Sequence, residues 1–297
     1  MKKRISESLI RCNVNMKKII IIGATGMLGK PVTKELINAG FVVTLLARDK
    51  NKAQQLFPSA KIIQGDVFDK DSLVKAFTRQ EIVYMNLSVA QSSKKNDTQP
   101  EREGIDNIIS AAKQTGIQRL AYLSSLVHLY NGMHGFNWWA FDIKRRAVEK
   151  IKASGIPHSI FHPSTFMETF PYQMMRGNKI VLLGNSEMPM WFIAASDYAR
   201  QVVNSFAIAG NENNEYIIQG TEPFTFDEAT KVFINNYPKA KLKTMKAPMG
   251  SMKFLGNFNQ KFNYGWHICE ALNKYPEKFN AEKTWKELGK PEIMLAS

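Results

Sequence analysis

Residues 19–29 read IIIIGATGMLG, and this stretch decides the fold. Four consecutive isoleucines form an apolar run of the kind found in a parallel strand that is buried on both faces. The run stops at a glycine-rich loop, and an amphipathic pattern that predicts a helix over residues 27–38 follows at once. A strand, a GxxGxxG loop and a helix in this order predict the phosphate-binding turn of a dinucleotide-binding βαβ unit.

Each of the three glycines of this loop is expected for a separate physical reason. We expect Gly23 to turn the chain sharply off the strand, Gly26 to keep a side chain away from a pyrophosphate, and Gly29 to bring the helix close to the sheet. The first helical turn then offers free N–H groups and a partial positive charge to the phosphates. The alternative is a tight turn that binds nothing. The candidate phosphate-binding residues are Gly23, Thr25, Gly26, Met27, Leu28 and Gly29.

Apolar strands and amphipathic helices alternate after this unit. Such alternation predicts an α/β fold of the Rossmann type, with a doubly wound parallel sheet. Crossovers between parallel strands are right-handed, so the ligand-binding loops gather at the carboxyl ends of the strands. We expect strands over residues 42–46, 62–64, 82–87, 120–123 and 158–161, and helices over residues 71–77, 102–114 and 141–153.

The regular pattern ends near residue 162, where prolines and glycines begin to separate short segments. We therefore divide the chain into a mobile tail (1–15), a nucleotide-binding domain (16–162) and a mixed region (163–297). The mixed region is expected to complete the sheet and to form a smaller C-terminal lobe for a substrate or a partner.

Two patterns stand out in the C-terminal region. Thr225 and Glu228 have the spacing of a capping box and predict a helix that ends near Asn236. Three phenylalanines then recur at helical spacing, and we interpret their face as the core of the lobe in preference to an aromatic ligand site. These residues are Phe254, Phe258 and Phe262.

Composition limits the classes of function. The 297-residue chain is 44% hydrophobic, which suits a globular protein. Its two cysteines form neither a metal-ligand cluster nor a disulfide framework, so we expect no metal site and a cytoplasmic location. Because no apolar stretch reaches the roughly 18 residues of a membrane span, we expect none.

The net charge of +14 is concentrated at the two ends of the sequence. Residues 1–18 hold six Lys and Arg against one acid, and residues 231–297 hold twelve Lys against five Glu, whereas residues 19–230 hold 22 against 20. The C-terminal lysines are dispersed and accompany no nucleic-acid-binding motif. We interpret the excess as a solvated basic surface, in preference to a surface for nucleic acid or an anionic membrane.

The end of the second strand indicates which dinucleotide binds. An acid at this position would bind the ribose 2′-hydroxyl of NAD(H), but the sequence has Ala47 and then Arg48, whose planar guanidinium suits a 2′-phosphate. Asp49 does not fit a 2′-phosphate site, but it could point away as a local cap. NADP(H) is therefore favoured, with NAD(H) as the alternative. Further cofactor-binding candidates end the later strands: Asp66, Val67, Leu87, Ser88 and Ser124.

Several motifs together resemble the short-chain dehydrogenase/reductase superfamily, specifically its atypical NmrA-like branch. They are GATGMLG at 23–29, LARD at 46–49, GDV at 65–67, YLSS at 122–125, Lys144, SGIPHSIFHPSTFME at 154–168, WFIAASDYAR at 191–200 and YIIQG at 216–220. The resemblance implies that Lys144 is the catalytic lysine and also binds the nicotinamide ribose. It further implies that Pro163 and Phe166 border the nicotinamide.

The sequence departs from the superfamily at the catalytic tyrosine. Four residues before Lys144, where that tyrosine is expected, this chain has Ala140. A ketone reduction would then need another proton donor, such as water, Tyr130, His128 or His134.

We therefore expect an NADPH-dependent oxidoreductase that passes a hydride to a small apolar or aromatic electrophile. Ala140 favours the alternative of a non-catalytic NADP(H)-sensing regulator, and an accessory scaffold or a sugar-nucleotide epimerase is less favoured. The expected partner is a small-molecule substrate or a regulatory protein, and the expected assembly is a monomer or a homodimer.

Overall fold

The isoleucine run forms an interior strand of a seven-stranded parallel sheet. The computed structural model of the chain describes residues 17–238 and 241–295, so the expected tail over residues 1–15 lies outside the described residues. Strand order is β3-β2-β1-β4-β5-β6-β9, the Rossmann order with one added strand. This confirms the fold class predicted from the sequence.

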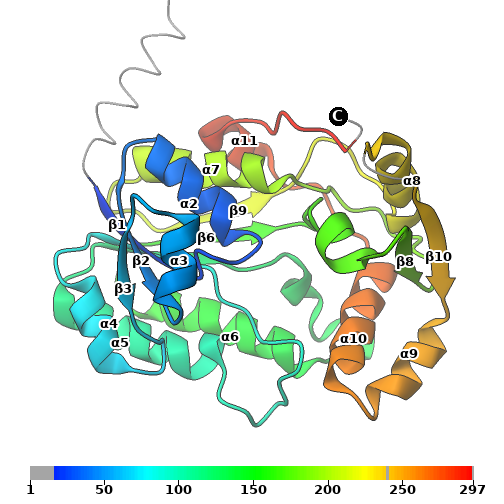
Figure 1. Ribbon diagram of the computed structural model, residues 1–297, viewed down its shortest axis with the longest axis horizontal. Coiled ribbons are helices and arrows are strands. Elements are labelled where there is room, and N and C mark those ends of the chain that lie inside the picture. Colours follow the sequence, from blue (N-terminus) through cyan, green and yellow to red (C-terminus); the bar gives the residue numbers. More distant parts are fainter. Residues whose placement is uncertain (1–16, 239–240, 296–297) are drawn as a thin grey trace, which may run out of the picture.

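The strands of this sheet and the helices between them alternate along the chain (Figure 1). The strands are β1 (Lys18–Ile22), β2 (Val42–Ala47), β3 (Lys61–Gln64), β4 (Ile82–Met85), β5 (Arg119–Leu123), β6 (His158–Pro163) and β9 (Asn214–Ile218). The helices are α2 (Gly29–Asn38), α3 (Lys50–Leu56), α4 (Lys70–Phe77), α5 (Ile105–Thr115), α6 (Trp139–Ala153) and α7 (Ala195–Ile208).

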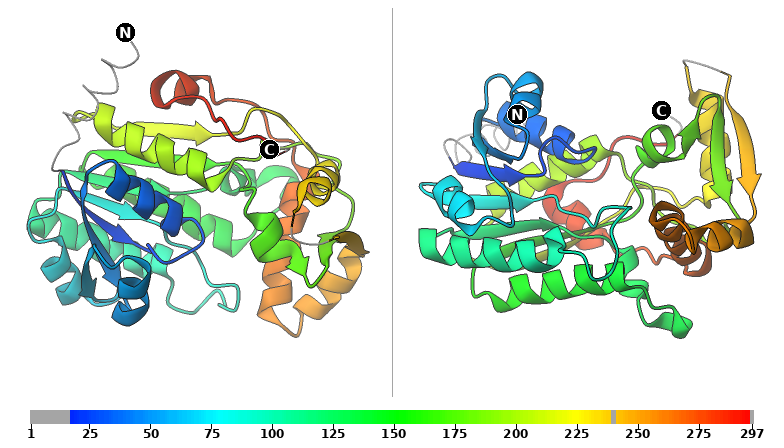
Figure 2. Two further views of the ribbon diagram at one scale, coloured as in Figure 1. Left: turned by 45° about the horizontal axis from the view of Figure 1, so that its top comes forward. Right: turned by 60° about the horizontal axis from the view of Figure 1, so that its bottom comes forward.

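Strand β1 buries both of its faces. Ile19 and Ile21 belong to the apolar core beneath α2 and α7, whereas Ile20 and Ile22 belong to the core beneath α4, α5 and α6. The helices therefore cover the sheet as two outer layers (Figures 1 and 2). This arrangement explains why the strand is a continuous apolar run and does not alternate with polar residues.

A smaller lobe lies beyond the carboxyl ends of the large sheet (Figure 1). It contains a three-stranded sheet in the order β10-β8-β7 and three helices. Thr225 caps its first helix, and the predicted capping box with Glu228 is confirmed. The elements are β7 (Met175–Arg176), β8 (Lys179–Leu183), α8 (Phe226–Asn236), β10 (Lys243–Ala247), α9 (Met249–Gly256) and α10 (Gln260–Lys274).

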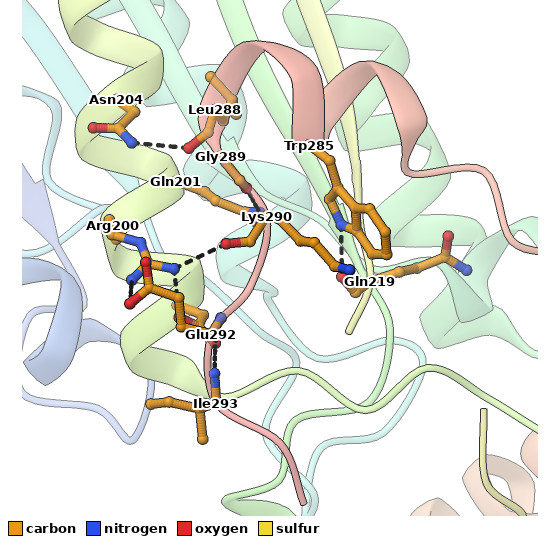
Figure 3. A network of polar contacts seen from close by, with 11 residues as sticks. Arg200, Gln201, Asn204, Gln219, Trp285, Leu288, Gly289, Lys290, Glu292 and Ile293 are labelled. Atoms are coloured by element: carbon orange, nitrogen blue, oxygen red, sulfur yellow. Dashed lines mark hydrogen bonds and ion pairs between the residues drawn. The ribbon is translucent and has the colours of Figure 1, made fainter. Parts of the chain in front are cut away.

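The C-terminal segment returns from the lobe to the large sheet (Figures 1 and 3). Helix α11 (Glu282–Leu288) lies beside β9 and α7, and the chain after it follows α7. Side chains of α7 bind the backbone of this segment: Gln201 donates to the Gly289 carbonyl (2.8 Å) and Asn204 to the Leu288 carbonyl (2.8 Å). Asp197, which is buried, accepts from the N–H groups of Glu292 and Ile293. The end of the chain thus joins the large sheet to the lobe, because residues 288–293 bind α7 whereas Leu295 is buried in the apolar core of the lobe.

The structure corrects three expectations about the elements. The first helix begins at Gly29 and not at residue 27, because residues 23–28 form the loop. A helix, Lys50–Leu56, lies where none was expected, and a π-helical turn, Pro100–Gly104, precedes α5. The phenylalanine face of residues 254–262 is exposed, so its assignment to the core of the lobe was wrong.

Candidate functional site

A groove of about 370 Å³ lies at the carboxyl ends of the first four strands. It is the place where parallel sheets bind ligands, since the strand order reverses between β1 and β4. The groove brings together seven of the residues predicted to bind the cofactor: Gly23, Thr25, Arg48, Asp66, Val67, Leu87 and Ser88. Gly26, Met27 and Leu28 of the loop, and Gly29 at the start of α2, are not among the residues that line the groove.

The geometry of the loop separates the roles of its glycines. A Cβ atom on Gly23 would lie 2.1 Å from the carbonyl oxygen of Asn86, and one on Gly29 would lie 2.1 Å from that of Gly23. The protein's own backbone therefore excludes any side chain at both positions. Gly26 is exposed, and a Cβ atom there would meet nothing closer than the Gly23 oxygen at 3.4 Å. Folding does not require this glycine, whereas a pyrophosphate approaching the loop would.

Arg48 and Asp49 line the same groove but have different partners. Asp49 caps α3, because its Oδ1 accepts from the N–H of Lys52 at 2.9 Å. The guanidinium of Arg48 is exposed and forms no ion pair within the described parts of the chain. The carboxylate of Asp49 is thus engaged by its own helix, whereas the guanidinium of Arg48 is available to an anionic ligand.

The carboxylate of Asp66 also has a hydrogen-bond partner in its own loop. Its Oδ1 accepts from the N–H of Phe68 at 3.0 Å, which closes a turn after β3. Asn86 lines the groove at the end of β4, and its side-chain amide lies 3.5 Å from the carbonyl of Gly23.

Four other predicted residues lie away from this groove, toward the end where β5 and β6 terminate. Ser124 and Pro163 end neighbouring strands and are buried. Phe166 is buried against Tyr198, with ring centroids 5.5 Å apart, so its side chain belongs to the core.

Lys144, the fourth of these residues, is held by a buried ion pair. Its Nζ donates to Oε1 of Glu101, and the hydroxyl of Tyr122 donates to the same oxygen. The side chain of Glu101 is 1% exposed and that of Lys144 is 15% exposed. Burial and the Glu101 carboxylate raise the pKa of Tyr122 well above its usual value, so this phenol stays protonated.

Sequence reasoning missed Glu101. It follows Pro100 at the start of a helical segment, where an acid ordinarily interacts with the helix dipole. Nothing in the sequence links it to Lys144, which is 43 positions away.

The environment of Ala140 contains no replacement for the missing phenol. Ala140 is buried in an aromatic cluster with Trp138, Phe141 and Tyr130. Tyr130 is itself buried and stacks on Tyr275 with ring centroids 5.3 Å apart. Burial raises the pKa of Tyr130, and so does the charge of Glu277.

Two further titratable groups are buried near the ends of β5 and β6. His128 donates from Nδ1 to the carbonyl of Ser125, and burial lowers its pKa to about 4, so the ring is neutral at pH 7. Glu277 accepts from Ser164 at 2.7 Å and from Gln219, and burial raises its pKa to about 7. His128 is part of the interior and is not placed to donate a proton to an external substrate.

A second cavity, of about 530 Å³, lies in the small lobe between the β8–β10 sheet and α10. Its lining is largely apolar and includes Leu182, Phe226, Ile268 and Leu272. Gln91 also lines it, three residues after Ser88 of the groove. One loop, which follows β4, therefore borders both this groove and the apolar cavity.

A search for metal ligands among residues 17–238 and 241–295 gives no group of three or more His, Cys, Asp or Glu side chains that could hold an ion. The helices of the same residues include none that is long and apolar enough to span a bilayer.

A family model described as NAD(P)H-binding matches residues 23–207, which include the glycine loop, the groove and Lys144. The chain belongs to the NAD(P)H-binding family. This membership confirms the resemblance deduced from the motifs. Among the relatives of this family member, photosystem II assembly factor Ycf39 of Cyanophora paradoxa is 23% identical over 258 residues, which cover 86% of this chain and 79% of that protein.

Solved structures of reductases share the fold of this NAD(P)H-binding protein. Triphenylmethane reductase of Citrobacter sp., complexed with NADP(H), has a TM-score of 0.70 at 18% identity and matches 94% of this chain and 98% of its own. The NADPH-dependent quinone oxidoreductase of Escherichia coli, complexed with NADPH, has a TM-score of 0.68 at 21% identity, with 94% and 97% matched. At these identities the likeness concerns the fold alone.

Gly26→Val should separate nucleotide binding from folding. The valine side chain would occupy the space above the loop, so we expect the dissociation constant for NADPH to rise at least about tenfold. The melting temperature should change little, because no backbone atom clashes with a Cβ atom there. Calorimetric titration and thermal unfolding measure the two quantities. Unchanged affinity would contradict the assignment of this loop to phosphate binding.

Glu101→Gln should destabilise the protein by about 3 kcal/mol, because it leaves the ammonium of Lys144 partly buried without its counter-ion. Adding Lys144→Met should recover part of this loss, which a double-mutant cycle in urea would measure. Lys150→Ala is the control, since it removes an exposed ion pair with Asp106 and should cost less than about 1 kcal/mol. Equal costs for Glu101→Gln and Lys150→Ala would contradict the buried pair.

Proposed function

We propose that this protein is an NADPH-dependent oxidoreductase that reduces a small apolar or aromatic electrophile. The observation that carries the proposal is that one loop, which follows β4, borders two sites: a groove that contains the free cation of Arg48 and the start of the glycine loop, and an apolar cavity. Ligand sites of enzymes commonly combine an apolar pocket with a few polar groups that fix orientation.

The residues of the groove fit a dinucleotide with a 2′-phosphate. Gly26 leaves room for the pyrophosphate, and the N-terminus of α2, which has no side-chain cap, would offer it free N–H groups. Arg48 would bind the 2′-phosphate through its planar fork, while Asp49 is engaged as a helix cap. When bound, NADPH supplies the hydride.

The apolar cavity supports an apolar or aromatic substrate. Two reductases with the same fold are named for triphenylmethane and quinone substrates, which agrees with such a cavity. Residues of the lobe would exclude water and hold the acceptor, and positioning of this kind accounts for much of the rate of a two-substrate reaction.

The proton supply limits the choice of acceptor. Ala140 lies in an apolar cluster and cannot donate, and Lys144 is paired with Glu101. We therefore infer an acceptor that takes its proton from solvent or needs none, such as a quinone, an activated alkene or a carbocationic dye. A simple ketone is a poor candidate, because its reduction depends on a positioned acid.

A non-catalytic NADP(H)-sensing regulator or accessory protein is the second candidate. The absent phenol and the engagement of Lys144 by Glu101 favour it. A photosystem II assembly factor is among the relatives, which agrees with a role in assembly.

Arg48→Ala should weaken NADPH binding at least about tenfold, because the 2′-phosphate loses a charge-assisted partner. Binding of NADH, which lacks this phosphate, should change less than about twofold. Lys34→Ala, which removes an exposed lysine of α2, is the charge-matched control. Calorimetric titration of both nucleotides measures the effect, and equal losses for NADPH and NADH would exclude Arg48 as the 2′-phosphate ligand.

The reductase proposal predicts that NADPH absorbance falls when a quinone, an enal, a diazo compound or a triarylmethane dye is added to the full chain. Leu182→Trp, which fills the apolar cavity, should abolish this oxidation and leave the NADPH dissociation constant unchanged. NADPH binding without oxidation by any of these acceptors would favour the regulator.

A further inference from the structure

The corner formed by α9 and the turn into α10 carries an exposed apolar surface. Phe258 is 77% exposed, Phe254 is 63% exposed and Leu255 is 41% exposed. The two phenylalanine rings contact each other, with centroids 5.5 Å apart, so the three side chains form one continuous surface, which we call the α9 patch. Single exposed apolar side chains are ordinary, but adjacent exposed aromatic rings mark a binding surface.

The patch is exposed because α9 packs through a different side. Gly256 is buried against α10, where a Cβ atom would lie 3.0 Å from the Trp266 ring. This close approach fixes one side of α9 against α10. Phe254 in α9 and Phe258 just after it remain exposed, and α9 lies at the end of the molecule opposite β2 and β3 (Figure 1). Their exposure is therefore a consequence of how α9 docks.

The stretch of sequence that contains the patch carries charge of a single sign. The sequence contains no Asp or Glu between Glu228 and Glu270. It contains seven lysines over the same interval: Lys231, Lys239, Lys241, Lys243, Lys246, Lys253 and Lys261. Lys253 and Lys261 stand on either side of the patch in the sequence, and both are exposed. Lys246 is already paired with Asp227, so its charge is partly neutralised.

We propose that the α9 patch docks the protein on an anionic lipid bilayer. Phe254, Leu255 and Phe258 enter the headgroup region, and Lys253 and Lys261 contact the lipid phosphates. A helical surface that combines exposed phenylalanine and leucine with lysines has the composition of an interfacial membrane anchor. The anionic surface attracts the lysines, and the apolar side chains then supply the remaining binding free energy.

The apolar cavity of the small lobe extends to this corner. Met252 of α9 and Lys261 and Phe262 of α10 line the cavity of about 530 Å³, and Lys261 also flanks the patch in the sequence. A bilayer in contact with the patch would therefore lie close to residues that line the cavity. Docking on a bilayer requires no cofactor chemistry. The docking proposal can therefore be tested independently of the proposed reductase activity.

Vesicle sedimentation of the full chain tests the proposal. We expect binding to phosphatidylcholine vesicles that contain phosphatidylglycerol, and none to phosphatidylcholine alone. Phe254→Ser with Phe258→Ser should lower the partition coefficient at least about tenfold without changing the salt dependence. Lys253→Glu with Lys261→Glu should lower it to a similar extent and flatten the salt dependence.

Matched control variants distinguish binding through the α9 patch from attraction by the overall positive charge of the protein. Lys61→Glu with Lys70→Glu makes the same change of net charge at the opposite end of the molecule, and Val42→Ser with Ile208→Ser removes exposed apolar side chains elsewhere. Both control pairs should retain vesicle binding, and circular dichroism should show native thermal unfolding for all four variants. Absence of binding to the anionic vesicles would overturn the proposal in favour of an acidic protein partner. Equal losses in the patch and control variants would overturn it in favour of non-specific attraction, including that of the basic residues 1–18.

Discussion

The contact between the backbones of Gly23 and Gly29 is the constraint on which the site depends. At both positions a Cβ atom would overlap a carbonyl oxygen at 2.1 Å, so β1, the loop and α2 meet without intervening side chains. This close packing fixes the start of α2 directly behind the loop that follows β1, at the switch point of the sheet. Gly26 stands between the two and is the glycine that the protein's own atoms leave exposed.

Charge is distributed differently at the two ends of the proposed cofactor site. At the 2′-phosphate end, the carboxylate of Asp49 caps a helix while Arg48 keeps a free guanidinium. At the nicotinamide end, the ammonium of Lys144 is bound to Glu101, which also accepts from Tyr122. A buried ion pair holds its members in place more than it adds stability. The 2′-phosphate end thus offers a free positive charge to an anion, whereas at the nicotinamide end the protein's own Glu101 neutralises the charge of Lys144.

The C-terminal region serves two structural purposes. Its last segment binds α7 through backbone carbonyl and N–H groups (Figure 3), and Leu295 near its end is buried in the core of the small lobe. Its middle part, α9 and α10, encloses the apolar cavity and exposes the α9 patch. The basic excess of this region, interpreted from the sequence as a solvated surface, surrounds exposed phenylalanines in the structure, and this juxtaposition supports membrane docking over simple solvation.

The sequence by itself determined the parallel sheet, the glycine loop and the position of Arg48, because these follow from patterns within about thirty consecutive residues. The capping box of Thr225 is equally local and was predicted correctly. Only the tertiary structure decided that Glu101 pairs with Lys144, since the two residues come from helical segments that meet through packing. The tertiary structure also decided that the phenylalanines at helical spacing are exposed. Periodicity identifies one face of a helix, but it does not show whether another element covers that face. Here Gly256 and Trp266 bring the other side of α9 against α10.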